Sequence, residues 1–184
     1  MKNLALITLL VGSLTLSAQD KPLDVLHTGE KVSKELLKKL SSNLKHELKT
    51  NGLIAAADFC NEKAYTLTQD VNLHQVNGVS VKRISTKVRN PINAPSEDEK
   101  LILQKFQDKL GQKDFPAYII DKTGDTYKYY KPLVIKKDVC LKCHGDISKN
   151  EKLTKFMNEH YPDDKATGYK MNDLRGAVVV EIKQ

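Results

Sequence analysis

Hydrophobic residues in the first third of the chain recur every three or four positions, which is the period of an amphipathic helix. Within residues 30–49 the apolar positions are Val32, Leu36, Leu37, Leu40, Leu44 and Leu48. Thr50-Asn51-Gly52 then interrupts the pattern. A second helix is predicted from Leu53 to Thr68, with one stripe formed by Leu53, Ala56, Ala57, Cys60 and Ala64. The small residues of this stripe allow a flat group or another backbone to approach closely.

From Gly78 onward the period changes to two, which is typical of strands. Strands are predicted around Val79 and Val81, over 116–121, over 126–135 and over 176–183, with a hairpin turn at 122–125. Two Ser-x-x-Glu capping patterns, at Ser96 and Ser148, predict helices that end near Leu110 and His160. Helices followed by antiparallel strands predict one α+β domain.

The N-terminus has the pattern of a secretory signal peptide. Lys2 is the only charge before Asp20, an apolar run spans Leu4 to Leu16, and Ser17-Ala18 supply small residues for cleavage. The run is shorter than the roughly 18 to 20 residues that cross a bilayer. We therefore predict a signal peptide at 1–18 and an exported domain at 19–184, in the periplasm or otherwise secreted, with no transmembrane segment after cleavage.

The charge of the chain is moderately basic, with 30 Lys and Arg against 23 Asp and Glu and a formal net charge of +7. The positive residues are spread along the sequence, and their densest run, Lys31 to Lys49, lies on a helix face that we interpret as solvated. Export and the lack of a recognition motif argue against a nucleic-acid partner. A basic surface suits an acidic redox or signalling protein instead.

The segment Cys140-Leu141-Lys142-Cys143-His144 is the strongest chemical signal, because Cys-x-x-Cys-His is the attachment signature of c-type haem. In this interpretation Cys140 and Cys143 bind one haem c covalently, and His144 becomes the first axial ligand of the iron. An exported chain usually oxidises its cysteines in pairs. Since the chain has 3 cysteines, Cys60 is then left single and must be buried or bound.

The second axial ligand must come from elsewhere in the chain, and the residues leave several candidates. These are Cys60, His27, His46, His74, His160, Met157 and Met171. The haem propionates also need partners, and the stretch before the Pro91–Pro95 loop offers Arg83, Arg89 and Asn90.

Zinc is the main alternative to haem. Cys60, Cys140, Cys143 and His144 would make a Cys₃His site, which is a chemically reasonable tetrahedral set. The export signal and the direct adjacency of His144 to Cys143 favour haem over zinc. A thioredoxin-like dithiol is weaker still, because Lys136-Lys137-Asp138 stands where a buried strand should lead into the motif.

Four stretches carry a resemblance to a known family: AAADFCNEKAYTL, VKRISTKVRNPINAPSEDE, YYKPLVIKKDVCLKCHG and YPDDKATGYKMNDLRGAVVV. The chain resembles exported or sensor-linked domains with a single c-type haem on a PAS-like fold, long treated as a domain of unknown function. The resemblance implies an antiparallel PAS-like sheet, covalent haem at Cys140 and Cys143, His144 as proximal ligand and Cys60 as the other axial ligand. Asn172 stands where a glycine is expected, and asparagine also tolerates a left-handed turn.

The expected function is that of a periplasmic redox or gas sensor. A cysteine ligand that leaves the iron on reduction would open a position for NO or CO. The alternative is a small periplasmic electron-transfer cytochrome that docks a redox protein. No constellation of acid, base or nucleophile stands out, so we expect no enzymatic activity.

Overall fold

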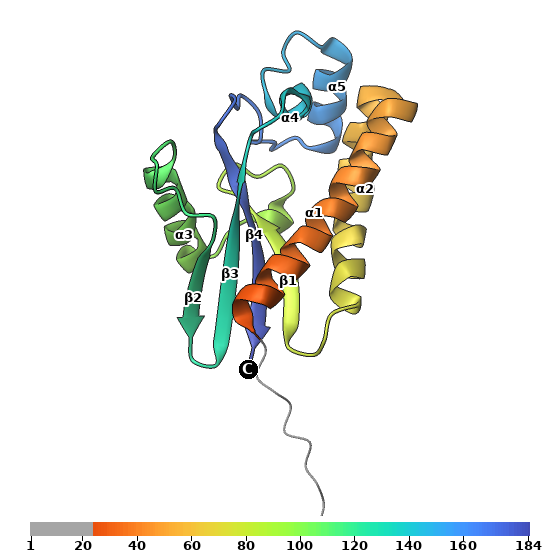
Figure 1. Cartoon of the computed structure of the whole chain (residues 1–184). Helices are drawn as coiled ribbons and strands as arrows, with labels where there is room; N and C mark the ends of the chain where they lie inside the picture. The colour runs from red at the N-terminus through yellow and green to blue at the C-terminus, as the bar shows by residue number, and fades with distance from the viewer. Residues whose placement is uncertain (1–23) are drawn as a thin grey trace, which may run out of the picture.

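The computed structural model describes residues 24–184, without the side chains of residues 61 and 62, so the predicted signal peptide lies outside it. The helices and strands are, in chain order, α1 (Val25–Thr50), α2 (Gly52–Leu73), β1 (Val79–Ile84), a 3₁₀ turn η1 (Pro91–Asn93), α3 (Glu97–Lys109), β2 (Ile119–Thr123), β3 (Thr126–Val134), α4 (Asp138–His144), α5 (Glu151–His160) and β4 (Leu174–Lys183) (Figure 1). Between residues 24 and 184, none of the helices combines the length and apolarity that a bilayer crossing requires.

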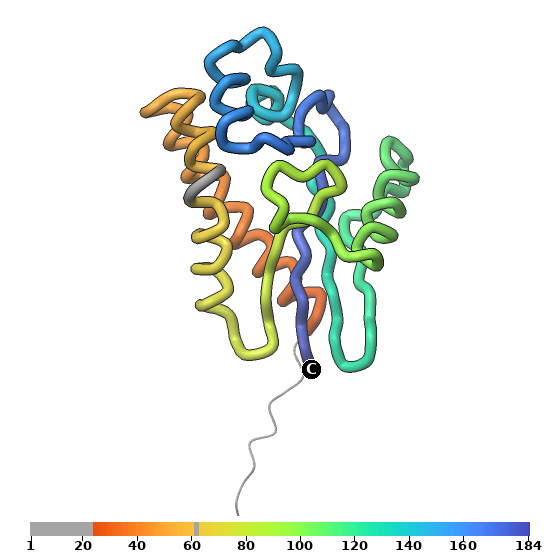
Figure 2. Tube along the Cα trace, turned by 180° about the vertical axis from the view of Figure 1, so that it is seen from behind, coloured from red at the N-terminus to blue at the C-terminus, as the bar shows by residue number. Residues whose placement is uncertain are grey.

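The four strands form one antiparallel sheet in the order β1-β4-β3-β2. The C-terminal strand β4 therefore lies in the middle, between β1 and β3. Helices α1 and α2 cover one face of the sheet, and α3 packs near the other (Figures 1 and 2). This arrangement confirms the predicted α+β class with antiparallel strands.

The sheet has a hydrophobic core on each face because the buried residues of β4 alternate. Val178 and Val180 pack with Val32 and Leu36 of α1. Val179, on the opposite face, belongs to a second cluster formed with α3 and the neighbouring strands. Every residue from Ala177 to Val180 is at most 1 % exposed, so the last strand is the centre of the molecule.

Helices α1 and α2 both extend beyond their predicted bounds. Helix α1 begins at Val25 because the side chain of Asp24 caps it, accepting a hydrogen bond from the backbone N–H of His27 at 3.0 Å. Helix α2 continues past Thr68 because Val71 is fully buried in the core and Asp70 forms an ion pair with Lys39 of α1.

The two predicted capping boxes have different outcomes. At α3 the prediction is confirmed, since Ser96 and Glu99 bond each other's backbone N–H groups. At α5 it is wrong: the side chain of Asn150 caps the helix, accepting from the N–H of Leu153 at 3.0 Å. Ser148 instead donates its hydroxyl to Asp146 at 2.7 Å, in the turn that precedes the helix.

Two turns depend on left-handed backbone conformations. The hairpin between β2 and β3 turns at Gly124, with φ +58°, where the sequence predicted it. Asn172, with φ +71°, adopts the left-handed conformation in place of a glycine, and its side chain accepts a hydrogen bond from Lys136 at 3.0 Å. The loop before β4 therefore keeps its shape with asparagine.

Helices α4 and α5 and the segment that follows them lie together at one end of the sheet, beside the N-terminal part of α2 (Figure 1). Ala57 of α2 packs there against Leu153, Met157 and Tyr161. Residues from the first helical pair and from the last third of the chain thus share a small core at this end.

Candidate haem-attachment site

The Cys-x-x-Cys-His segment forms the short helix α4, which ends at His144. Residues three apart on a helix lie on the same side, so Cys140 and Cys143 project from one face. The helix stops at Gly145, whose N–H donates to the carbonyl of Leu141 at 2.9 Å. A Cβ atom on Gly145 would lie 2.6 Å from that carbonyl oxygen, so only glycine fits this end.

The segment after α5 runs back along α4 and is bonded to it. The N–H of Tyr169 donates to the carbonyl of His144 at 2.9 Å, and the N–H of Gly168 donates to the carbonyl of Gly145 at 3.0 Å. The ring of Tyr169 also meets the ring of His144 edge to face, with centroids 6.1 Å apart. The end of the attachment helix is therefore held by a segment more than twenty residues further along the chain.

The imidazole of His144 is oriented by the backbone. Its Nδ1 lies 2.8 Å from the carbonyl oxygen of Ala166. Because a carbonyl only accepts hydrogen bonds, Nδ1 carries the proton and Nε2 keeps its lone pair. Burial, followed by the charges of Arg175 and Arg89, lowers the pKa of His144 to about 3. The ring is thus neutral at physiological pH, with Nε2 in the form that binds a metal.

Cys60 lies on α2, on the stripe of small residues identified from the sequence, near the same group of side chains. Burial raises the pKa of its thiol, and the positive charges of Arg83, Arg89 and Arg175 partly offset that effect. The same three arginines act on His144. Cys143 of α4 also packs against the small core that contains Ala57 of α2, so the two helices meet at this site.

The two cysteines of α4 pack against different small cores, Cys143 against that of α2 and α5 and Cys140 against Ile135, Ala166 and Tyr169. Burial raises the pKa of Cys143 to about 11, with Arg89 acting in the opposite direction and Cys60 adding to the rise. All three cysteines of the chain are free thiols. The structure thus places Cys60, Cys140, Cys143 and His144 near one another and near Arg83 and Arg89, six of the seven predicted site residues.

The three residues predicted for the propionates have different surroundings. Arg83 is largely buried, and its Nε has no hydrogen-bond partner within the described part of the chain. Arg89 donates to Asp164 and to the carbonyl of Cys143. The side chain of Asn90 accepts from the N–H of Ile92 at 3.0 Å and so caps the η1 turn. Arg83 is the one of the three with an unused buried donor.

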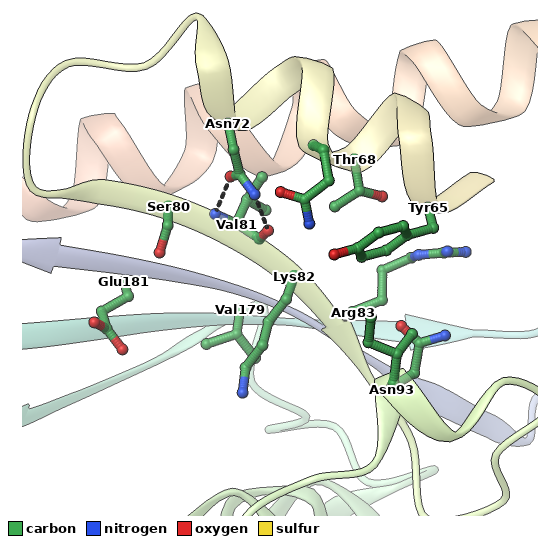
Figure 3. Close-up of a pocket in the computed structure, with 12 residues that line it drawn as sticks. Tyr65, Thr68, Asn72, Ser80, Val81, Lys82, Arg83, Asn93, Val179 and Glu181 are labelled. Carbon is green, nitrogen blue, oxygen red and sulfur yellow. Dashed lines mark hydrogen bonds between the residues drawn. The ribbon is translucent and has the colours of Figure 1, made fainter. Parts of the chain in front are cut away.

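A cavity of about 350 Å³ lies between α2 and β1. Figure 3 shows the side chain of Arg83 extending along α2 beneath Tyr65, while Asn72 pairs with the backbone of Val81 at the other end. The guanidinium group thus lies at the end of the cavity nearer to Cys60, which is five residues before Tyr65 on the same helix.

Of the other candidates for a second axial ligand, Met157 belongs to the core against which Cys143 packs, and the rest are exposed. His160 is exposed, stacks on Phe156 with centroids 4.0 Å apart and bonds the carbonyl of that residue. Met157 is buried in the small core below α5, and Met171 is 37 % exposed. The remaining histidines, all exposed, are His27, His46 and His74.

No three His, Cys, Asp or Glu side chains are arranged to hold a metal ion within the residues that the structure describes.

Sequence reasoning missed three residues of the site: Asp164, Tyr169 and Arg175. Arg175 donates to the hydroxyl of Ser85 at 2.6 Å, and its guanidinium lies 5.4 Å from the centroid of the Tyr169 ring. All three fall in the stretch YPDDKATGYKMNDLRGAVVV, which carried the family resemblance. Asp164 follows Pro162-Asp163, a sequence typical of a turn, so its pattern alone gave no sign of a role.

The fold and the site define an α+β protein in which a Cys-x-x-Cys-His helix is packed over one end of an antiparallel sheet. The model of the Tll0287-like family matches residues 15–183, and the chain belongs to that family. This agrees with the haem-domain family expected from the sequence.

Among solved structures, the chain is similar to the crystal structure of the cyanobacterial heme-protein Tll0287. The TM-score is 0.60 at 20% sequence identity, over 87% of this chain and 92% of the other. At this identity the likeness shows the fold. The comparison with curated proteins gives no match.

Proposed function

We propose that this protein is an exported c-type haem protein with one covalently attached haem c. Cys140 and Cys143 form the thioether bonds, and His144 Nε2 and Cys60 Sγ are the axial ligands. The observation that carries the proposal is the convergence of α2 and α4. Cys143 of α4 packs against the small core that includes Ala57 of α2, about one turn before Cys60, and the charges of the same three arginines act on both Cys60 and His144.

The residues around Cys60 and His144 fit a haem. His144 is neutral, with its Nδ1 proton fixed on Ala166. The buried Nε of Arg83 has no partner among the residues that the structure describes, which suits a propionate carboxylate. Membership in a family that carries the name of a heme-protein supports the same assignment.

A bound haem would supply a one-electron redox centre that also binds small gases. The protein's contribution is the electrostatic setting of the two ligands. Burial disfavours the thiolate of Cys60, whereas Arg83 and the other two arginines favour it. The net effect raises the pKa of Cys60, so the thiolate is disfavoured, and reduction of the site, which adds negative charge, further favours its protonation and release.

This balance favours a sensor of redox state or of a gas such as NO or CO, built on a PAS-like sheet in the periplasm or otherwise outside the cell. The signal would pass to a partner protein. The second candidate is a small electron carrier. It is favoured by the net charge of +7, which suits an acidic redox partner, and by the filling of both axial positions. No enzymatic activity is proposed.

Spectra of the Cys60→Ala variant in both oxidation states test the ligand assignment. The variant should retain its covalent haem and lose the low-spin ferric spectrum of the parent, because one axial donor is gone. Cys60→Met is the matched control, since a thioether should restore a six-coordinate site at a higher reduction potential. Unchanged low-spin spectra in Cys60→Ala would show that Cys60 does not bind the iron.

Gas binding separates the sensor from the carrier. A sensor should bind CO or NO rapidly once reduced, as Cys60 departs. A carrier should stay six-coordinate, refuse CO at every pH and exchange electrons quickly with a cytochrome. A reduced protein that is inert to CO would contradict the sensing mechanism.

A further inference from the structure

We infer that Arg89 and Asp164 form a positioning pair that holds the attachment helix and fixes the orientation of His144. The inference rests on the proposed haem function and assigns Arg89 a role other than propionate binding. Both side chains are only 8 % exposed, and they pair through the Nη2 of Arg89 and the Oδ2 of Asp164 at 2.9 Å.

The two carboxylate oxygens of Asp164 accept hydrogen bonds from different partners. Oδ2 accepts from Arg89, whose Nε lies 3.0 Å away. Oδ1 accepts from the backbone N–H of Ala166 at 2.7 Å. The carbonyl of Ala166 is in turn the acceptor for His144 Nδ1 at 2.8 Å. Asp164 and His144 thus bond the backbone of Ala166 on either side of its Cα, and the carboxylate fixes the residue whose carbonyl orients the imidazole.

Arg89 holds the same helix at a second point. Its Nη2 donates to the carbonyl of Cys143 at 2.7 Å. This carbonyl belongs to the last turn of α4, where no further helical N–H is available to it. A buried guanidinium that satisfies it removes the cost of an unpaired carbonyl and complements the negative end of the helix. The pair therefore contacts both residues at the end of α4. Arg89 bonds the carbonyl of Cys143, and Asp164 acts on His144 through Ala166.

The hydrogen-bond partners behind a metal-binding histidine set its ring orientation and its donor strength. With Asp164 in place, the Ala166 carbonyl is held against Nδ1, and the charge of Arg89 is balanced. Loss of the carboxylate would weaken His144 as a ligand of the iron, and it would leave the positive charge of Arg89 unbalanced nearby. Both effects favour the ferrous state, so they raise the reduction potential.

The ion pair between Lys82 and Glu99 provides a matched control. Glu99 is also a fully buried carboxylate, bonded to Lys82 at 3.0 Å and to the N–H of Ser96 at 3.0 Å. It belongs to α3, and neither Lys82 nor Ser96 is one of the proposed haem-binding residues. Glu99→Gln should destabilise the fold and leave the potential of the haem at its parent value.

The test measures the reduction potential and the electron paramagnetic resonance of the ferric protein, each in the haem-loaded form. Asp164→Asn preserves side-chain volume but keeps only one acceptor oxygen, so it removes the charge and one of the two bonds, to Arg89 or to Ala166. We expect it to shift the ferric-to-ferrous equilibrium toward ferrous by about tenfold, which is about 59 mV for a one-electron couple, and to alter the g values. Asp164→Glu should recover much of the parent potential.

Parent potential and parent g values in a haem-loaded Asp164→Asn protein would overturn the inference, as would an equal shift in Glu99→Gln. If Asp164→Asn fails to fold, Arg89→Lys takes its place. It keeps the positive charge but cannot bridge Asp164 and Cys143, and it should change the g values in the same sense. A parent protein without haem would instead overturn the proposed function, so the two failures are distinguishable.

Discussion

At the scale of single residues, Gly29 shows how closely α1 approaches the sheet. A Cβ atom built on Gly29 would lie 2.2 Å from the ring of Tyr129, which is itself fully buried. Glycine usually weakens a helix by roughly 0.5 to 1 kcal/mol relative to alanine. Here the contact with Tyr129 outweighs that preference, because no room exists for a methyl group.

The Gly29→Ala variant should therefore be less stable than the parent by about 1 to 3 kcal/mol, the usual cost of overpacking a core. The measurement is urea unfolding followed by circular dichroism. Lys34→Ala, on the exposed side of the same helix, is the control and should change the stability little. A stabilised Gly29→Ala protein would show that α1 does not lie against Tyr129.

Glu99 gives a prediction for pH dependence. Burial raises its pKa, but hydrogen bonds from Lys82 and from the backbone of Ser96 have the opposite sign, and the net pKa is lowered. A carboxylate with a lowered folded-state pKa contributes stability above its unfolded pKa of about 4.3. That stability is lost as the pH falls through the folded-state value.

The Glu99→Gln variant should lose about 1 to 3 kcal/mol at pH 7, because a buried charge-assisted hydrogen bond is removed. The difference from the parent should shrink as the pH falls below about 4, where the parent carboxyl becomes protonated. Denaturant unfolding at pH 7, 5 and 3 measures both quantities. A difference that stays constant over this range would mean that the carboxylate is not the stabilising species.

At the scale of elements, strand β1 is an edge of the sheet, and α2 protects it. The side chain of Asn72 accepts from the N–H of Val81 at 2.7 Å and donates to the carbonyl of the same residue at 3.1 Å. The side-chain amide of Asn72 thus makes the two hydrogen bonds that a neighbouring strand would otherwise make with Val81, as Figure 3 shows. Unpaired edges invite association with other chains, so this contact protects the protein as well as stabilising it.

The Asn72→Ala variant should speed amide hydrogen exchange at Val81 and increase aggregation on mild heating. Its stability should fall by about 1 to 2 kcal/mol for the two lost hydrogen bonds. Gln69→Ala, one turn earlier on the same helix and exposed, is the control and should leave exchange at Val81 unchanged. Unchanged exchange in Asn72→Ala would contradict the protective role of the amide.

The identity and order of the elements could be predicted from periodicity, whereas their ends depended on particular polar side chains. The pattern located α1 and α2 because their apolar faces are buried. It missed the first turn of α1 because the capping Asp24 lies upstream of the apolar period. It placed the start of α5 on Ser148, whereas the side chain of Asn150 makes the cap. Competing caps a few residues apart have the same sequence signature.

At the scale of the whole molecule, the sequence pattern identified the attachment motif of the candidate site but not the residues that the fold brings to it. Adjacency in the motif linked Cys140, Cys143 and His144, but nothing in the spacing brings Cys60 to them. Its place came from the family resemblance, and the packing of α2 beside α5 gives the physical basis. Asp164 was missed because its role depends on a fold that returns the segment after α5 to α4.

The whole account depends on haem attachment at α4, with His144 and Cys60 on either side of the iron. The most direct measurement is the intact mass of the protein made in cells equipped for cytochrome c maturation, together with its absorption spectrum before and after denaturation. The account predicts one haem per chain that stays attached in denaturant and is lost in the Cys140→Ala, Cys143→Ala double variant. A colourless parent protein with the mass of the polypeptide alone would contradict it.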